Sequence, residues 1–393
     1  MPSITEVSKS LADHGQTLKE WSTAVVRPLA RAADEQHAPP ANWKDIVASC
    51  PVPLSSQSEE KAPYNDGYWV GRGVEYENIA YGDVWLQPLL GGGLGCVVVD
   101  SMGTEAQVER WGTKSVARNG WMSSFALTEP GFGSDTSRVS TTATQDGDSW
   151  VLKGNKIYCS AGADSDYVTV FATLDKNLGP TGITAFVVPI DTPGLIIAKA
   201  NEDKLGLRSW VTSELLFDDC RVPLDHRLGS DSNGTLHERR SGRSGALGAL
   251  SFNRPSMSAF AIGVAQAALD TTTELLLESR TGFAPHRWRT IEDEIATMNV
   301  SLERGRRTVY RAQRLVDAGN PDNAAAATAK AYAPRTCERL VRRCMQLLGP
   351  DGASTELLLE KWYRDLKIFD IFEGSGEIQR IVVGRKLMGR LVS

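Results

Sequence analysis

Residues 125–135 of this chain read Phe125-Ala126-Leu127-Thr128-Glu129-Pro130-Gly131-Phe132-Gly133-Ser134-Asp135. On their own these residues indicate a glycine-rich turn. They lie near residue 122, where the character of the sequence changes. Patterns typical of amphipathic helices precede this point, and short alternating segments typical of strands follow it.

The region before this stretch reads as helical. Apolar residues recur at steps of three and four from Ile4 to Val25, which predicts a long amphipathic helix that is broken by Pro39-Pro40. A short helix is expected over residues 43–47, and residues 54–68 read as a polar loop. Helical patterns resume from Gly73 to Trp111.

A glycine-rich segment, Gly91-Gly92-Gly93-Leu94-Gly95, interrupts these helical patterns. It does not match Gly-x-Gly-x-x-Gly, and no lysine followed by Ser or Thr comes after it as in a P-loop. We interpret it as close helix packing or a turn, with phosphate binding as the second alternative.

The region after residue 122 reads as short strands joined by turns. Residues 140–144 alternate, Asp146-Gly147 is a hairpin signal, and Trp150-Val151-Leu152 follows it. We predict a compact all-β domain, either a barrel or a sandwich. The further predicted strands are Tyr167–Thr173, Ile183–Pro189, Leu195–Lys199 and Glu214–Val222.

The last region is predicted to be an antiparallel four-helix bundle. A basic loop over residues 237–243 precedes it, and helical stripes run from Pro255 onward and through residues 291–302. Asn320-Pro321-Asp322 is read as an N-cap with proline at the first helical position, and a fourth helix is expected near Ser375. The expected domains are residues 1–121 (helical), 122–228 (β) and 229–393 (helical bundle).

Composition bounds the function. The chain has 393 residues, 41% apolar and 23% charged, which describes an ordinary soluble globular protein of two or three domains. A net charge of −5 argues against a general binder of nucleic acid or of anionic membranes. No apolar run reaches the length of a membrane span, and no signal peptide is visible.

The cysteines and histidines argue for a reduced protein without a metal. Six scattered cysteines form no Cys-x-x-Cys, which favours free thiols and a cytoplasmic location. The five histidines show no spacing typical of metal ligands, so we expect no metal site.

A second stretch carries the candidate chemistry: Asp370-Ile371-Phe372-Glu373-Gly374-Ser375-Gly376-Glu377. A carboxylate among apolar neighbours, beside a glycine that lets a ligand approach the backbone, suits a general base, because burial raises its pKa. The alternative interpretation is a helix N-terminus with Ser375 as the N-cap.

The order of helices, β domain and helix bundle, together with several motifs, resembles the FAD-dependent acyl-CoA dehydrogenase family over residues 5–390. Residues 125–135 resemble the family's Thr-Glu-Pro-x-x-Gly-Ser-Asp loop, and residues 154–160 resemble its Gly-x-Lys-x-Trp/Tyr-Ile-Thr strand. The resemblance implies that both segments hold the flavin and that Ser134 also lines the thioester site. The implied flavin contacts here are Phe125, Leu127, Thr128, Gly133, Ser134, Tyr158 and Ser160.

Further motifs imply substrate contacts and contacts between subunits. Residues 251–255 resemble the family's Asp-x-x-Arg segment, with Ser251 where aspartate is common. The substrate contacts implied here are Ser251, Asn253 and Arg254, although an amide at Asn253 cannot serve as the base. The contacts implied with the flavin of a partner subunit are Arg280, Phe283, Gln346 and Gly349, with a surface arginine as the alternative for Arg280.

The resemblance places the catalytic base at Glu373 and implies the reaction. Glu373 would take the α-proton of an acyl-CoA, while a hydride passes from the β-carbon to the flavin and a trans-2-enoyl thioester forms. Gly374 would contact the thioester, and Ser375 and Glu377 the cofactor. The implied partners are an electron-transfer flavoprotein and further copies of the chain, as a dimer of dimers (homotetramer).

Three other functions stay open on the sequence. The basic loop and Ser251 motivate the same chemistry on an acyl-carrier-protein thioester. A flavin oxidase or monooxygenase of this fold is a second alternative, which Glu373 disfavours. A non-catalytic subunit of a mixed oligomer is a third, motivated by departures from the family pattern around Arg280 and at Pro350. The acyl group itself is not predicted.

Overall fold

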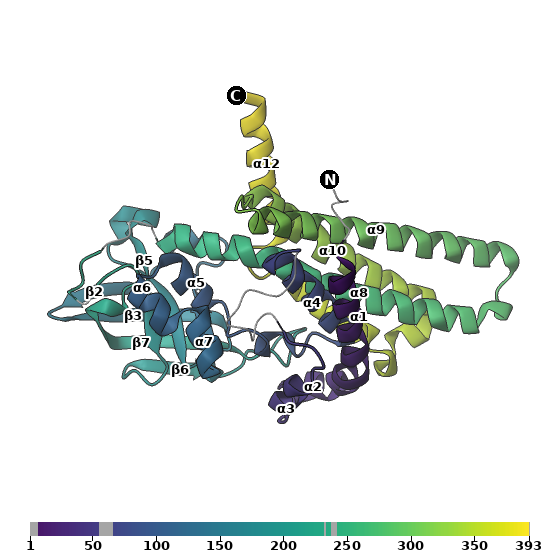
Figure 1. The fold of residues 1–393 in the computed structure, drawn as a ribbon, viewed down its shortest axis with the longest axis horizontal. Helices are drawn as coiled ribbons and strands as arrows, with labels where there is room; N and C mark the ends of the chain where they lie inside the picture. Colours follow the sequence, from purple (N-terminus) through teal and green to yellow (C-terminus); the bar gives the residue numbers. More distant parts are fainter. Residues whose placement is uncertain (1–6, 55–65, 232, 237–241, 393) are drawn as a thin grey trace.

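The computed structural model describes residues 7–54, 66–231, 233–236 and 242–392. Its strands gather at one end of an elongated molecule, and its longest helices extend to the other end (Figure 1). The order of helices, sheet and helices confirms the predicted fold class.

The helical region before the sheet is more broken than its apolar pattern predicts. The predicted helix over residues 4–25 ends as an α-helix at Trp21, and a π-type turn and a 3-10 turn containing Pro28 follow it. Of the predicted loop over residues 54–68, residues 55–65 lie outside the described residues, and Tyr68 begins a helix. The α-helices are α1 (Lys9–Trp21), α2 (Ala30–Gln36), α3 (Trp43–Ala48), α4 (Tyr68–Gly82), α5 (Gly95–Met102), α6 (Glu105–Trp111) and α7 (Thr113–Asn119).

The glycine-rich segment before α5 is a turn packed against the sheet, as one of its two interpretations predicted. Gly92 and Gly93 have φ values of 62° and 82°, a region that favours glycine. A Cβ on Gly93 would lie 1.8 Å from the carbonyl oxygen of Ser123. The Ser123 backbone N–H donates to the carbonyl of Gly92 at 2.7 Å, which ties the turn to the first strand.

Seven strands form one curled sheet, where the sequence left a barrel and a sandwich open. Strand β1 pairs with β4 in parallel, while β2, β3, β7 and β6 follow one another antiparallel. The four-residue β1 was not predicted, because so short a segment shows no alternation. The strands are β1 (Ser123–Ala126), β2 (Thr142–Asp146), β3 (Ser149–Ser160), β4 (Tyr167–Thr173), β5 (Ile183–Pro189), β6 (Leu195–Lys199) and β7 (Thr212–Pro223).

Two predicted helix starts in the last region are wrong. The first long helix begins at Gly242, so Pro255 lies inside it; residues 237–241 of the basic loop lie outside the described residues. The next start falls at Asn323, where the Asp322 carboxylate accepts from the Ala324 N–H at 2.8 Å, so Asp322 is the N-cap. The helices are α8 (Gly242–Glu278), α9 (Pro285–Asp317), α10 (Asn323–Leu348), α11 (Leu359–Phe369) and α12 (Gly376–Val392).

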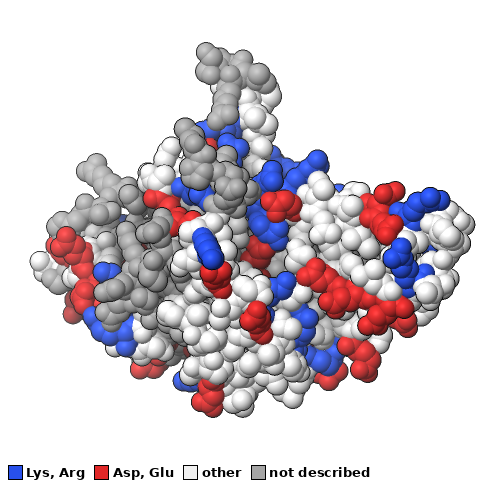
Figure 2. All heavy atoms as spheres, turned by 45° about the vertical axis from the view of Figure 1, so that its right-hand side comes forward, with Lys and Arg blue, Asp and Glu red and all other residues white. Residues whose placement is uncertain are grey.

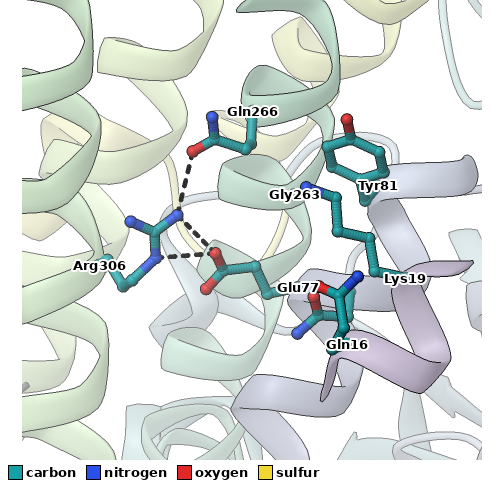
Figure 3. Close-up of a pocket in the computed structure, with 8 residues that line it drawn as sticks. Gln16, Lys19, Glu77, Tyr81, Gly263, Gln266 and Arg306 are labelled. Carbon is teal, nitrogen blue, oxygen red and sulfur yellow. Dashed lines mark hydrogen bonds and ion pairs between the residues drawn. The ribbon is translucent and has the colours of Figure 1, made fainter. Parts of the chain in front are cut away.

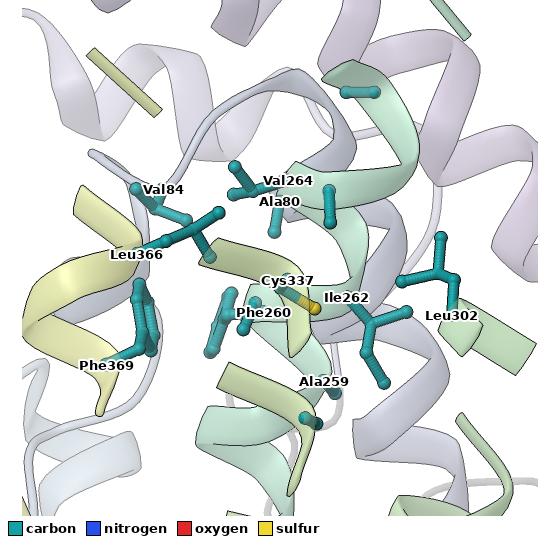
Figure 4. Close-up of a cluster of buried hydrophobic side chains, with 14 of the residues drawn as sticks. Ala80, Val84, Ala259, Phe260, Ile262, Val264, Leu302, Cys337, Leu366 and Phe369 are labelled. Atoms are coloured by element: carbon teal, nitrogen blue, oxygen red, sulfur yellow. The ribbon is translucent and has the colours of Figure 1, made fainter. Parts of the chain in front are cut away.

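The long helices share one core with α4 from the first region. Figure 4 shows Ala80 of α4, Phe260 of α8, Leu302 of α9 and Leu366 of α11 converging on this core. The short helix α11, which was not predicted, packs here, while α12 projects away from the bundle (Figure 1).

Helix α4 is fixed at its start and along its side. The carboxylate of Asp317, at the end of α9, accepts hydrogen bonds from the backbone N–H groups of Trp69 and Val70, both at 3.0 Å. A Cβ on Gly263 of α8 would lie 2.0 Å from the carbonyl oxygen of Glu77, so α4 and α8 touch through their backbones. Side chains on the remaining faces of α4 are therefore held in place.

The surface carries charges of both signs. On the described part of the face in Figure 2, Lys and Arg side chains lie beside Asp and Glu side chains. Within the described residues, no helix is both long enough and apolar enough to cross a bilayer.

Candidate active site

The loop between α11 and α12 holds the candidate base in an uncommon backbone conformation. Glu373 has a φ of 56° and Gly374 a φ of 89°, and a side chain at Glu373 makes its conformation costly. Arg254 compensates by donating from Nε to the carbonyl of Glu373 at 2.8 Å, and Gln379 donates to the carbonyl of Gly374 at 3.0 Å. Helix α12 begins at Gly376, directly after Ser375, so the predicted helix start is confirmed beside the carboxylate.

The carboxylate of Glu373 is only half satisfied. Its Oε1 accepts from the amide of Asn253 at 2.6 Å, whereas its buried Oε2 has no partner among the described residues. Burial raises the pKa of Glu373, and the positive charge of Lys330, the Asn253 hydrogen bond and Arg254 oppose that rise. A raised pKa and an unpartnered oxygen are properties of a carboxylate that takes a proton.

One large cavity joins this carboxylate to the two sequence segments that resemble flavin-binding motifs. Its volume is about 1580 Å³, above the range of about 300–1,000 Å³ that one small ligand fills, so two ligands fit together. All seven predicted flavin contacts in the first two motifs line it, and so does Ser375. Its lining also includes the predicted substrate residues Asn253, Arg254 and Gly374.

A buried ion pair binds the two segments to each other. Glu129 and Lys156 are both buried, and Nζ of Lys156 lies 2.8 Å from Oε1 of Glu129 and donates to the carbonyl of Leu127 at 3.1 Å. The Ile157 N–H donates to the carbonyl of Thr128 at 2.9 Å. These bonds fix the loop that carries Thr128 against strand β3.

Strand β3 is irregular where it reaches the cavity. Its pairing with β7 shifts register between Lys156 and Cys159, and Tyr158 in this bulge has a φ of 57°. A bulge redirects a side chain, and here the Tyr158 ring lines the cavity while 60% of the residue stays exposed. An uncovered aromatic ring with the hydroxyls of Thr128, Ser134 and Ser160 in the same cavity fits a planar, polar cofactor such as flavin.

Six predicted site residues do not line this cavity. Ser251 bonds to Asn323 at 3.0 Å instead, and Glu377 is exposed. The other four lie near the turn between α8 and α9 and the end of α10, where Phe283, Leu347 and Leu348 pack around Trp288 and Ile291. These four are Arg280, Phe283, Gln346 and Gly349, and none of them lines the cavity.

The sequence interpretation missed two cations of the site. Lys330 is fully buried on α10, and Nζ donates to the carbonyl of Phe369; burial lowers its pKa to about 8, although Glu373 opposes the shift. On the same helix Ala326, Ala327, Ala333 and Pro334 are buried. The position of Lys330 among these small apolar residues is the sequence signal that could have indicated a buried lysine. Arg72 on α4 lines the cavity, between tyrosines four residues away on either side.

A second, smaller cavity is lined by a carboxylate, Glu77, whose two oxygens already have partners. Its volume is about 230 Å³, and it lies where α1, α4, α8 and α9 meet (Figure 3). Glu77 is paired on both oxygens, with Arg306 at 2.7 Å and the Tyr310 hydroxyl at 3.1 Å. Its carboxylate therefore has no free oxygen for proton transfer.

Comparison with known proteins gives consistent matches over most of the chain. Family models described as "Acyl-CoA dehydrogenase, middle domain" and "Acyl-CoA dehydrogenase, C-terminal domain" match residues 124–220 and 240–388. The mitochondrial short-chain specific acyl-CoA dehydrogenase of Bos taurus is 34% identical over 387 residues, covering 95% of this chain and 89% of that protein.

Solved structures agree with these sequence matches. Butyryl-CoA dehydrogenase from Megasphaera elsdenii is 29% identical with a TM-score of 0.86, covering 98% of this chain and 99% of that chain. Glutaryl-coenzyme A dehydrogenase in complex with glutaryl-CoA is 27% identical with a TM-score of 0.86, covering 98% of this chain and 96% of that chain.

Proposed function

The chain belongs to the acyl-CoA dehydrogenase family, and from that premise we propose that it oxidises the α,β-bond of an acyl thioester with Glu373 as the base. The family is one of FAD-dependent oxidoreductases. The observation that carries the proposal is the buried, unpartnered Oε2 of Glu373 in a cavity that also holds the flavin-type motifs.

The residues that would hold FAD are those of the two tied segments. The hydroxyls of Thr128, Ser134 and Ser160 would bond its polar edge, and the Tyr158 ring would pack against it. FAD, when bound, supplies the acceptor for the hydride that leaves the β-carbon.

The protein's own part in the reaction is to remove and hold the α-proton. Among the described residues Oε2 of Glu373 has no competing donor, so it is available to the proton of the substrate. Asn253 keeps the carboxylate in one orientation through Oε1. Arg254 fixes the carbonyl of the same residue, which limits how far the base moves during proton transfer.

The backbone beside the base is suited to bind the thioester oxygen. The N–H of Glu373 donates to no acceptor within the described part of the chain. Gly374 has no side chain that could cover this N–H, and a Cβ there would lie 2.4 Å from the Gln379 amide nitrogen, so the position requires glycine. An amide directed at the carbonyl oxygen stabilises the enolate that forms when the α-proton leaves.

The separate cluster near the α8–α9 turn supports a homo-oligomer. Arg280 is exposed, lies over the Trp288 ring at 5.2 Å and forms no ion pair within the described residues. A guanidinium there is available to a flavin pyrophosphate of a partner subunit. The reduced cofactor would pass its electrons to an electron-transfer flavoprotein.

The test is the substitution Glu373→Gln, which preserves shape but cannot accept the proton. We expect the purified variant to keep its yellow flavin and to lose flavin bleaching by acyl thioesters, on the order of 10²–10⁴-fold or more. Glu356→Gln, at an exposed carboxylate in another loop, is the matched control. Normal bleaching by Glu373→Gln would show that the base is another group. A separate comparison of bleaching of the wild type by CoA esters and by carrier-protein esters identifies the carrier of the acyl group.

A further inference from the structure

Arg72 places a positive charge on the wall of the main cavity. It extends from α4, where Nε donates to the Tyr76 hydroxyl at 2.6 Å and Nη1 to the Tyr68 hydroxyl at 3.2 Å. Its guanidinium also lies over the rings of Tyr76, at 4.9 Å, and Trp69, at 5.7 Å. The guanidinium is therefore oriented by its neighbours.

This cation has no anionic partner. Within the part of the chain that the structure describes, Arg72 forms no ion pair with a carboxylate. The Tyr76 hydroxyl does not supply the charge, because burial raises the pKa of Tyr76 to about 12 and leaves that hydroxyl protonated at neutral pH. Arginine does not lose its proton in proteins, so the positive charge of Arg72 stays uncompensated in a partly buried site.

The segment that follows α4 adds only uncharged residues to the cavity lining. Gln87, Gly91, Gly93 and Leu94 line the cavity in the same region of the chain, between α4 and α5. The two glycines add no side chain to the lining, and Gln87 adds a neutral amide. An apolar acyl chain that ended here would leave the cation desolvated without compensation.

We propose that Arg72 binds a carboxylate at the far end of the acyl chain, so that the preferred substrates are thioesters of dicarboxylic acids. This inference rests on the proposed function and specifies its substrate class. A guanidinium matches a carboxylate with two parallel hydrogen bonds, and the tyrosines and the Asp317 anchor of α4 hold it for that contact.

The experiment compares two series of CoA esters: glutaryl, adipoyl and suberoyl, against straight-chain esters of the same carbon number. We expect the wild type to show a kcat/KM at least about 30-fold higher for the best dicarboxylic ester than for its straight-chain match, as two charge-assisted hydrogen bonds imply. Arg72→Met should remove this preference by lowering kcat/KM far more on the dicarboxylic ester than on its straight-chain match. Arg72→Lys, which keeps the charge, should retain part of it.

Equal activity of the wild type on both series overturns the proposal. So does an Arg72→Met variant that keeps the preference, or one that loses flavin instead, since Arg72 would then serve the cofactor. Titrating both esters into Glu373→Gln measures binding without turnover. If no ester bleaches the wild type but the dicarboxylic esters bind more tightly in an Arg72-dependent way, the proposed function fails and the carboxylate site stands. Equal binding of both series overturns the site as well.

Discussion

Glu129, which is buried behind the Thr128 loop, and Glu373, which lines the cavity with a buried Oε2, have opposite environments. Both oxygens of Glu129 are satisfied, by Lys156 at 2.8 Å and by the backbone N–H groups of Ser140 and Thr141 at 2.7 and 2.9 Å. In the described part of the chain, Oε1 of Glu373 has one amide partner and Oε2 has none. Burial is common to both, so hydrogen bonding decides which carboxylate can react.

The pKa values follow the same division. Burial acts to raise the pKa of Glu129, but Lys156 and the hydroxyl donors outweigh it and lower that pKa to about 2. For Glu373 the effect of burial prevails and the pKa is raised, because Lys330 acts on it only through its charge and donates its hydrogen bond to the carbonyl of Phe369. Glu129 is thus a structural link that stays charged at neutral pH, and Glu373 is a group that can change its protonation state.

The largest expected effect comes from breaking the buried ion pair between Glu129 and Lys156. Lys156→Met leaves the Glu129 carboxylate buried without its cation, and we expect a loss of about 3–5 kcal/mol in the free energy of unfolding. Chemical denaturation of the FAD-loaded protein measures it. Because the pair fixes the Thr128 loop on β3, flavin affinity should fall as well.

The double variant Glu129→Gln/Lys156→Met is the matched control. It removes both charges, and we expect it to be more stable than Lys156→Met alone, because no uncompensated charge remains. Burial lowers the pKa of Lys156 even beside Glu129, so the pair carries a desolvation cost of its own. A double variant less stable than the single one would show that the pair is worth more than its desolvation cost.

A second effect appears in the acid stability of the wild type. The pKa of Glu129 is lowered from 4.5 to about 2, so its contribution is fully present above pH 4.5 and is lost as the pH falls toward 2. The shift corresponds to about 3 kcal/mol. We expect the stability difference between the wild type and Glu129→Gln to shrink from pH 6 to pH 2.5 in urea denaturation. A difference independent of pH would contradict the lowered pKa.

The sequence predicted the sheet better than the helix ends. Strands Tyr167–Thr173, Ile183–Pro189 and Leu195–Lys199 were predicted with their observed bounds, because turns of glycine and proline delimit them. The start of α8 was misplaced because Pro255 reads as a helix start, although the helix continues through it. Tertiary packing, which local propensity does not encode, supports that helix.

For the site, motifs located the cavity but not its cations. The segments around Thr128, Tyr158 and Glu373 were assigned to the site through their resemblance to family motifs, and they line one cavity. Lys330 and Arg72 were missed because each is an isolated charge in a helix, and its role depends on what the other helices bring to it. Long-range partners such as Phe369 for Lys330 are not visible in the sequence around either residue.

The smallest expected effect concerns the pKa of Glu373, the reactive one of the two glutamates. Lys330→Met removes the positive charge that opposes the rise in the pKa of Glu373, so that pKa should rise further. The base is ionised only above its pKa, and the acid limb of the pH profile of flavin bleaching should therefore move to higher pH. At a pH well above both limbs the rates should agree within a few-fold.

Lys330→Met also tests whether Lys330 acts on Glu373 through its charge or by supporting the local structure. Removing a buried cation that has no carboxylate in contact should change the free energy of unfolding by less than about 2 kcal/mol, well below the effect of Lys156→Met. Lys330→Arg keeps the charge and should leave the acid limb near that of the wild type. If Lys330→Met lowered bleaching equally at every pH, Lys330 would act by shaping the loop at Phe369 rather than through its charge, and the raised pKa of Glu373 would be a consequence of burial alone.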